Sequence, residues 1–148
     1  MLDFDLARAF DVVLCLFSSI GYLKSGAELR RTIENFARHV NPGGVVIVEP
    51  WLRRENFREG VISGLFVDQP DLKIARMARG SLDGDQSKFV FHYLVGTPTG
   101  IDYFNETHEL TMFPREDYIA AFEAAGLVTT WDEPGLMGRG LVIGVKPQ

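Results

Sequence analysis

The first third of the chain combines apolar runs with a helical pattern. Residues 12–17 form an unbroken apolar run rich in β-formers, which predicts a strand covered on both faces. After it, Ser25 and Glu28 have the spacing of a capping box, and apolar residues then recur every three or four positions. The Asn-Pro-Gly-Gly stretch at 41–44 should stop this helix and turn the chain into a second apolar strand at 45–48. The pattern predicts a βαβ unit, and hence two parallel strands.

The middle of the chain has a different pattern, in which extended segments are separated by short turns. The extended segments are 72–79, 88–95 and 101–112. Gly84-Asp85 stands between the first two, and the sequence Gly-Thr-Pro-Thr-Gly at 96–100 stands between the last two. Short glycine-containing turns between such segments predict an antiparallel meander, which we place at about residues 61–112.

The last third returns to a helix followed by strands. Residues 115–125 carry apolar positions at helical spacing, and Gly126 ends that pattern. Residues 127–131 and 140–145 are predicted strands, joined by a loop rich in glycine. The fold class predicted for residues 1–148 is α/β, in one domain with an antiparallel addition.

Composition and charge narrow the class of partner. The chain has 148 residues with a formal net charge of −5, which argues against nucleic acid or an anionic membrane surface as the main partner. No apolar stretch approaches the roughly 20 residues of a membrane span. Cys15 is the single cysteine, so no intrachain disulfide can form, and its apolar neighbours predict a small buried thiol. A reducing cytoplasm fits this cysteine usage.

Candidate chemistry follows the two predicted parallel strands. Ser18 and Ser19 come directly after the first strand, and Glu49 and Trp51 come directly after the second. In open α/β sheets, ligands bind beyond the carboxyl ends of the strands, and Gly21 would let the backbone approach a ligand closely. The alternative is that the serines only end the strand and cap the turn. The residues alone favour the two interpretations about equally.

Several segments together carry a resemblance to a known family. In chain order they are "FDVVLCLFSSIGYL", "FARHVNPGGVVIVEPW", "HELTMF", "YIAAFEAAGL" and "GRGLVIGV". They resemble the S-adenosylmethionine-dependent methyltransferases that N-methylate amino sugars on nucleotides, above all the dTDP-aminosugar N,N-dimethyltransferases of desosamine and mycaminose synthesis. "FSSIGYL", "EPW" and the late "GRGL" are more specific than the common "PGG" turn. The resemblance implies the C-terminal part of a Rossmann-like methyltransferase sheet with an added antiparallel β meander.

The resemblance also implies a cofactor, S-adenosylmethionine, and the residues that contact it. Phe17, Ser18 and Ser19 would line its methionine end, largely through backbone groups. Met1 lies in a segment, Met1-Leu2-Asp3-Phe4, that is similar to the family's adenine-contacting segment. No GxGxG motif occurs in the chain, so we expect a C-terminal portion of such an enzyme that binds the cofactor weakly or not at all by itself.

The acceptor would be a nucleotide-linked amino sugar or a similar small amine. Tyr22 stands where the family places an aromatic residue or histidine near the reacting nitrogen, and is the candidate catalytic residue. Since an unperturbed tyrosine has a pKa near 10, orienting the amine is its expected role, ahead of taking the proton. Glu49 would bind a sugar hydroxyl or the cationic amine, Trp51 would form an aromatic wall, and Arg139, exposed between two glycines, would grip a diphosphate.

Alternatives remain for these residues and for the function. If Tyr22 has no role in the reaction, it packs against the start of the predicted helix. Trp51 would then pack at the rim of the core, and Arg139 would be a solvated turn residue. The whole chain could instead be a non-catalytic, methyltransferase-like module that only dimerises or binds a ligand. Another small amine, or an oxygen, could be the acceptor. We expect a homodimer or higher oligomer, because an unpaired strand edge and the meander both invite association.

The three histidines do not predict a metal site. His39 lies near a predicted helix C-terminus, where a structural role is expected. His92 and His108 stand on the extended segments without metal-ligand spacing or cysteine support. We therefore expect no zinc.

Overall fold

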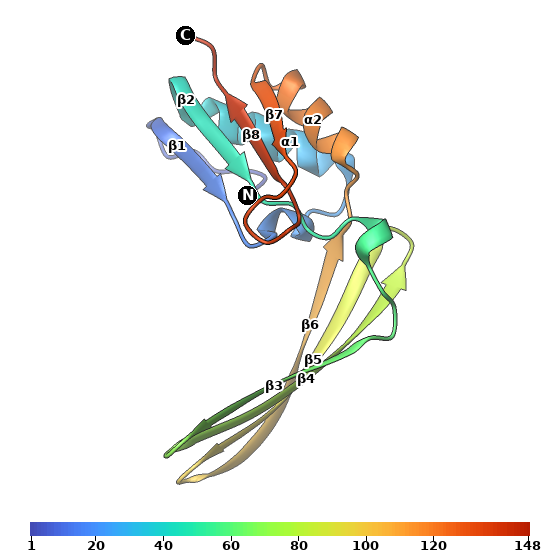
Figure 1. The fold of residues 1–148 in the computed structure, drawn as a ribbon. Helices are drawn as coiled ribbons and strands as arrows, with labels where there is room; N and C mark the ends of the chain where they lie inside the picture. The colour runs from blue at the N-terminus through green and yellow to red at the C-terminus, as the bar shows by residue number, and fades with distance from the viewer. The chain divides into compact units, whose positions relative to one another are not determined.

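The computed structural model describes all residues 1–148, and the chain divides into two compact units. The α/β unit comprises Met1–Asn56 and Thr111–Gln148, and the meander unit comprises Phe57–Leu110. Figure 1 shows the helices in the first unit and long strands in the second. The predicted α/β class is confirmed, with two separate sheets.

The sheet of the α/β unit has the strand order β1-β2-β8-β7. Its strands are β1 (Phe10–Cys15), β2 (Val40–Val48), β7 (Val128–Asp132) and β8 (Leu141–Val145). β1 and β2 are parallel, as predicted, whereas β8 runs antiparallel to both β2 and β7. The predicted turn at 41–44 lies inside β2, where the register with β1 shifts and Gly43 has φ +78°. The strand therefore absorbs these residues as an irregularity in its pairing.

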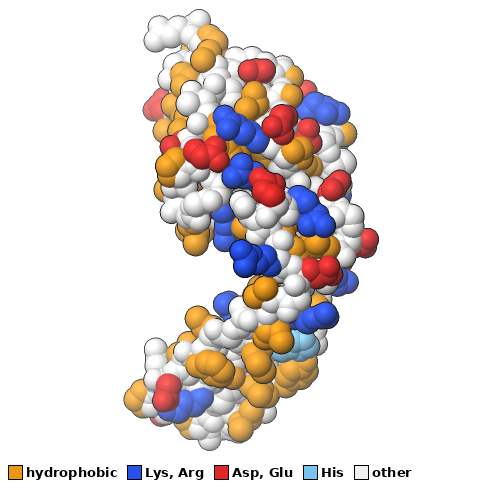
Figure 2. All heavy atoms as spheres, turned by 45° about the vertical axis from the view of Figure 1, so that its right-hand side comes forward, with side chains coloured by type: hydrophobic (Ala, Val, Ile, Leu, Met, Phe, Trp, Pro, Cys, Tyr) orange, Lys and Arg blue, Asp and Glu red, His pale blue; other side chains and the backbone are white.

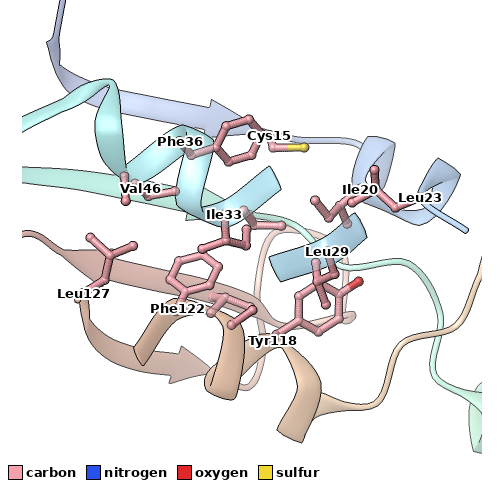
Figure 3. Close-up of a cluster of buried hydrophobic side chains, with 14 of the residues drawn as sticks. Cys15, Ile20, Leu23, Leu29, Ile33, Phe36, Val46, Tyr118, Phe122 and Leu127 are labelled. Atoms are coloured by element: carbon pink, nitrogen blue, oxygen red, sulfur yellow. The ribbon is translucent and has the colours of Figure 1, made fainter. Parts of the chain in front are cut away.

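Two helices pack on one face of this sheet. α1 (Gly26–Arg38) begins after Ser25, whose side chain accepts a hydrogen bond from the Glu28 amide, as the capping pattern predicts. α2 (Arg115–Ala124) begins after Pro114. Neither α1 nor α2 is long and apolar enough to cross a membrane. Figure 3 shows side chains of α1 and α2 meeting those of β1 and β2 in the core. The labelled members are Cys15, Ile20, Leu23, Leu29, Ile33, Phe36, Val46, Tyr118, Phe122 and Leu127.

The opposite face of the sheet is open. Val12 is 51% exposed and Leu14 is 56% exposed, although both lie in the apolar run of β1. The expectation of a strand covered on both faces is wrong here, because the helices lie on the side of Cys15 and Val46. β1 is also an edge strand, since only β2 pairs with it.

The meander unit is a four-stranded antiparallel sheet in the order β3-β4-β5-β6. Its strands are β3 (Ile62–Gln69), β4 (Leu72–Asp83), β5 (Gln86–Thr97) and β6 (Gly100–Thr111). The last three strands and the turns between them match the prediction, but β3 was missed. Two short 3₁₀ helices, η1 (Ser19–Tyr22) in the α/β unit and η2 (Arg54–Asn56) before the meander, complete the elements.

Large apolar side chains are exposed on the meander. Phe66 is 74% exposed and Ile101 is 77% exposed. With Ile74 and Leu94 they line a shallow, mainly apolar hollow of about 600 Å³. Figure 2 shows hydrophobic side chains gathered on the surface of this unit. An exposed apolar surface of this kind is typical of an interaction site.

Candidate functional site

The sequence-predicted residues that follow the parallel strands meet at one edge of the α/β sheet. In Figure 1, β1 and β2 end at the edge where the antiparallel strand β8 begins. The Ser18 segment follows β1, the Trp51 segment follows β2, and Arg139 lies in the loop before β8, separated from that strand by Gly140. Three chain segments far apart in sequence are thereby brought together at the edge that binds ligands in open α/β sheets.

The segment after β1 bends sharply at Phe17 and Ser18. Phe17 has φ +52° and Ser18 has φ +60°, so two consecutive non-glycine residues adopt the left-handed conformation. Each such residue costs about 1–2 kcal/mol relative to the right-handed region, because its β-carbon crowds the backbone. We call this two-residue bend the elbow. Ser18 is buried, whereas the Phe17 side chain is 78% exposed.

Glu49 supports the elbow from the end of β2. Its Oε2 accepts a hydrogen bond from the Phe17 amide at 2.7 Å, and its own amide donates to the Cys15 carbonyl at 2.8 Å. The residue is 0% exposed, and its second oxygen, Oε1, is buried without a hydrogen-bond partner. Glu49 is thus enclosed by protein at the end of β2, and contact of its carboxylate with a ligand stays a prediction.

Arg139 reaches the same elbow from the loop before β8. Its Nη1 donates to the Ser18 hydroxyl at 2.8 Å, and that hydroxyl donates to the Pro50 carbonyl at 2.8 Å. The guanidinium also lies over the Trp51 ring, 4.8 Å from its centroid, in a cation–π contact. Arg139 is therefore half-buried and oriented, not the exposed turn residue expected from its flanking glycines. A guanidinium held in this way keeps further N–H groups for an anionic ligand.

Ser19 and Tyr22 lie on η1, one turn beyond the elbow. Ser19 donates through Oγ to the Leu16 carbonyl at 3.0 Å, so its hydroxyl helps to close the turn. Tyr22 is 47% exposed. Gly21 is buried, and its amide donates to the Ser18 carbonyl at 2.9 Å. The tyrosine is thus accessible on a short helix that is anchored to the elbow.

Met1 lies near the end of β1. The Asn35 side chain donates to the Met1 carbonyl at 3.1 Å, and the Cys15 thiol lies 3.7 Å from the Met1 sulfur. Burial raises the pKa of Cys15 to about 11, which keeps the thiol protonated near neutral pH. Cys15 is thus a packing residue, as its apolar neighbours predicted.

Sequence reasoning missed the ion pairs that hold the loop of Arg139. Glu133 lies 3.2 Å from Arg53 through Oε1 and 3.2 Å from Arg115 through Oε2. Arg115 also lies over the Trp131 ring at 5.1 Å. No local signal in the sequence marks Arg53, because its partner Glu133 lies 80 residues away in sequence.

Neither the histidines nor the acidic residues form a group of three that could hold a metal ion. His39 is buried at the end of α1, where Nδ1 contacts the Asn35 carbonyl at 2.8 Å. Its Nε2 accepts a hydrogen bond from the Leu6 amide at 3.1 Å, so the ring fixes the N-terminal segment. This is the structural role expected from its position.

Comparisons with known proteins identify the relatives of this chain, although no family model matches it. The chain is 44% identical over 146 residues to the dTDP-3-amino-3,6-dideoxy-alpha-D-glucopyranose N,N-dimethyltransferase of Streptomyces fradiae. The match covers 98% of this chain and 57% of that enzyme. The relatives of this chain are dTDP-aminosugar N,N-dimethyltransferases. The resemblance carried by "FSSIGYL", "EPW" and "GRGL" is confirmed.

Solved structures agree with this relationship. Streptomyces venezuelae DesVI superposes with a TM-score of 0.93 at 40% identity, over 99% of this chain and 62% of DesVI. A second structure is that of CalS10, an amino pentose methyltransferase from Micromonospora echinaspora solved with S-adenosylmethionine bound. It superposes with a TM-score of 0.88 at 38% identity, over 98% of this chain and 61% of CalS10. The chain spans about three fifths of the length of these relatives. The Rossmann-like methyltransferase fold class is thus confirmed for the part that is matched.

Proposed function

We propose that this chain forms the acceptor-side portion of an S-adenosylmethionine-dependent N-methyltransferase. Its acceptor is the amino group of a nucleotide-linked amino sugar or a similar small amine. The observation that carries the proposal is the link from Arg139 through the Ser18 hydroxyl to the Pro50 carbonyl, which joins three strand-end segments at one sheet edge. The activities of the related N,N-dimethyltransferases supply the reaction class.

The chemistry asks for alignment more than for acid–base groups. A neutral amine attacks the methyl carbon in line, the C–N bond forms, and the bond from that carbon to the sulfonium sulfur breaks. The methylated amine then carries an extra proton, which it loses to water or to a base. Tyr22, exposed on η1, is suited to orient the amine by a hydrogen bond of its hydroxyl.

The other residues of the site would bind the cofactor and the nucleotide sugar. Phe17, Ser18 and Ser19 offer backbone groups for the methionine end of the cofactor, and Met1 belongs to the segment proposed for its adenine. Trp51 and Arg139 already stack on one another, so together they form a flat, cationic surface suited to a nucleotide diphosphate.

A chimera tests the proposal directly. The portion of the Streptomyces fradiae relative that the match leaves uncovered is joined to this chain and incubated with S-adenosylmethionine and dTDP-3-amino-3,6-dideoxyglucose. We expect mass spectrometry to detect addition of one and then two methyl groups. A folded chimera that binds the cofactor but methylates neither this sugar nor other small amines or alcohols would contradict the proposal.

The alternative is a non-catalytic module that only dimerises or binds a ligand. The exposed apolar surfaces of β1 and of the meander favour association whichever function holds. We therefore propose a homodimer or higher oligomer, formed through the meander or through the free edge of β1. Its partner is a second copy of this chain.

Light scattering on the purified chain tests the association. We expect a mass of at least two copies, and we expect Phe66→Asp with Ile101→Asp to lower it if the meander forms the contact. Val12→Lys with Leu14→Lys should lower it if β1 does. Leu136→Asp, at a 61% exposed loop residue, is the matched control. A monomer at high concentration would rule the oligomer out.

A further inference from the structure

The fully buried carboxylate of Glu49 has an unusual environment. Oε2 accepts a hydrogen bond from the Phe17 amide at 2.7 Å, while Oε1 is buried and has no hydrogen-bond partner. A buried carboxylate oxygen without a donor destabilises a fold, so an apolar side chain of similar volume would be the more stable choice. The residue therefore needs an explanation beyond packing.

The elbow supplies that explanation. Phe17 adopts φ +52° although its side chain is 78% exposed, so side-chain packing does not impose this conformation. The amide of Phe17 is instead held by Glu49, and the Ser18 hydroxyl is held by the Pro50 carbonyl. Both supports come from the end of β2. Strained backbone persists only where its surroundings fix it in this way.

The position of Arg139 depends on the elbow in turn. Arg139 Nη1 donates to the Ser18 hydroxyl at 2.8 Å, and Ser18 directly follows the residue that Glu49 holds. If the elbow relaxed to a right-handed or extended conformation, the Ser18 hydroxyl would leave both the Pro50 carbonyl and the guanidinium. The buried carboxylate and the half-buried cation are therefore coupled through two residues of strained backbone.

We propose that Glu49 is a positioning residue that holds the Phe17–Ser18 elbow, and through it Arg139, in the binding geometry without touching the ligand. This inference rests on the proposed function, and it replaces the expectation that Glu49 binds a sugar hydroxyl or the amine. Both carboxylate oxygens are enclosed by protein: Glu49 is 0% exposed, so no ligand atom can reach it in this structure. What matters for positioning is that Oε2 of Glu49 accepts the hydrogen bond of the Phe17 amide. The carboxylate itself makes no contact with the substrate.

Two substitutions separate positioning from direct binding and from simple packing. Glu49→Gln keeps the length of the side chain and an oxygen that can accept the Phe17 amide. Glu49→Leu fills the volume with an apolar side chain and removes the acceptor. Glu123→Gln, on the exposed surface of α2, is the matched control.

The first measurement needs no enzyme activity. In the 148-residue chain, the Phe17 amide proton should resonate downfield and be protected from exchange in the parent, in Glu49→Gln and in the control, and should lose both features in Glu49→Leu. The melting temperature of Glu49→Leu should equal or exceed that of the parent. An unchanged Phe17 amide in Glu49→Leu would overturn the proposal.

The second measurement uses the active chimera. Glu49→Leu should raise the Michaelis constant for the nucleotide sugar about tenfold or more while Glu49→Gln changes it less than about threefold. If Glu49→Gln is as impaired as Glu49→Leu with its Phe17 amide in place, the charge acts on the ligand and the positioning role is wrong. A chimera inactive even with Glu49 would refute the proposed function, and the amide measurement would still decide whether Glu49 holds the elbow.

Discussion

Gly140 lies directly against the ring of Trp131. A β-carbon at position 140 would stand 2.4 Å from Cζ2 of that ring, and the backbone there has φ +88°. The backbone of the same loop also packs closely on itself, because a β-carbon at Gly135 would stand 2.5 Å from the Gly140 carbonyl carbon. The loop that carries Arg139 is thus fixed by close backbone packing on an aromatic ring.

This packing predicts a difference between two glycines of the loop. Gly140→Ala adds a methyl group where the Trp131 ring already lies and forces a left-handed alanine, so it should lower the free energy of unfolding by about 2–5 kcal/mol. Gly138→Ala is the matched control, because Gly138 has φ +73° but no atom within 4 Å of an added β-carbon. Only the conformational cost of about 1–2 kcal/mol should remain there.

Urea denaturation of both variants measures the difference. Equal losses of stability would show that the contact between Gly140 and Trp131 yields easily. In that case the loop would be held mainly by the ion pairs of Glu133 with Arg53 and Arg115.

Arg139 should contribute to binding rather than to turnover. Arg139→Ala removes the guanidinium that donates to Ser18 and stacks on Trp51, and it should raise the Michaelis constant for a nucleotide-diphosphate sugar about tenfold or more. Turnover of bound substrate should stay nearer to the parent value. Arg139→Lys keeps the charge but loses the planar fork, so only partial recovery is expected. Steady-state kinetics of the chimera decide this, with Arg30→Ala on the exposed surface of α1 as control. A Michaelis constant unchanged in Arg139→Ala would exclude the diphosphate role.

Cys15 provides a pH-dependent test of the core. Burial raises its pKa from 9.0 to about 11, so the folded protein retains the thiol proton at a pH where the unfolded chain loses it. The stability that this proton contributes is fully present below pH 9 and is lost as the pH rises from 9 toward 11. At pH 8 the native thiol should react with iodoacetamide roughly 100-fold more slowly than the unfolded thiol, since two pKa units separate them. Equal rates in native and denatured protein would show that the segment around Cys15 opens readily.

The parts of the fold that local sequence determines were predictable. Ser25 and Glu28 define the start of α1 through contacts within one helical turn, and Gly126 ends the next helix in the same local way. β3 was missed because Gly64 and Asp68 interrupt its apolar pattern, and its pairing with β4 is what makes it a strand. The open face of β1 was missed because an apolar run alone does not show which neighbours are present to cover it.

In the candidate site, too, local features could be predicted from the sequence and tertiary contacts could not. The positions of Ser18 and Glu49 at strand ends could be inferred from sequence, because an apolar run that breaks into polar residues marks such an end. Arg139 was singled out by its flanking glycines. The contacts of these residues could not be inferred, since Glu49 lies 32 residues from Phe17 and Arg139 lies 121 residues from Ser18. The left-handed elbow is likewise a tertiary feature. Neither phenylalanine nor serine favours that conformation by itself.

Tyr22 is the remaining test of the site. Tyr22→Phe removes one hydroxyl from a side chain that is 47% exposed, so the melting temperature should change little. If that hydroxyl orients the amine or accepts its proton, turnover of the chimera should fall about 10- to 1000-fold. Tyr103→Phe, at a 58% exposed tyrosine of the meander, is the matched control and should retain the parent turnover.

Tyr22→Ala separates chemistry from packing at the same position. If the ring only packs against the start of α1, then Tyr22→Phe should keep full activity and Tyr22→Ala should lower the melting temperature. If the hydroxyl acts on the amine, both variants should lose turnover, and Tyr22→Phe should do so without loss of stability. Full activity in Tyr22→Phe would leave the elbow, Trp51 and Arg139 as a binding surface on which η1 only closes the turn after β1.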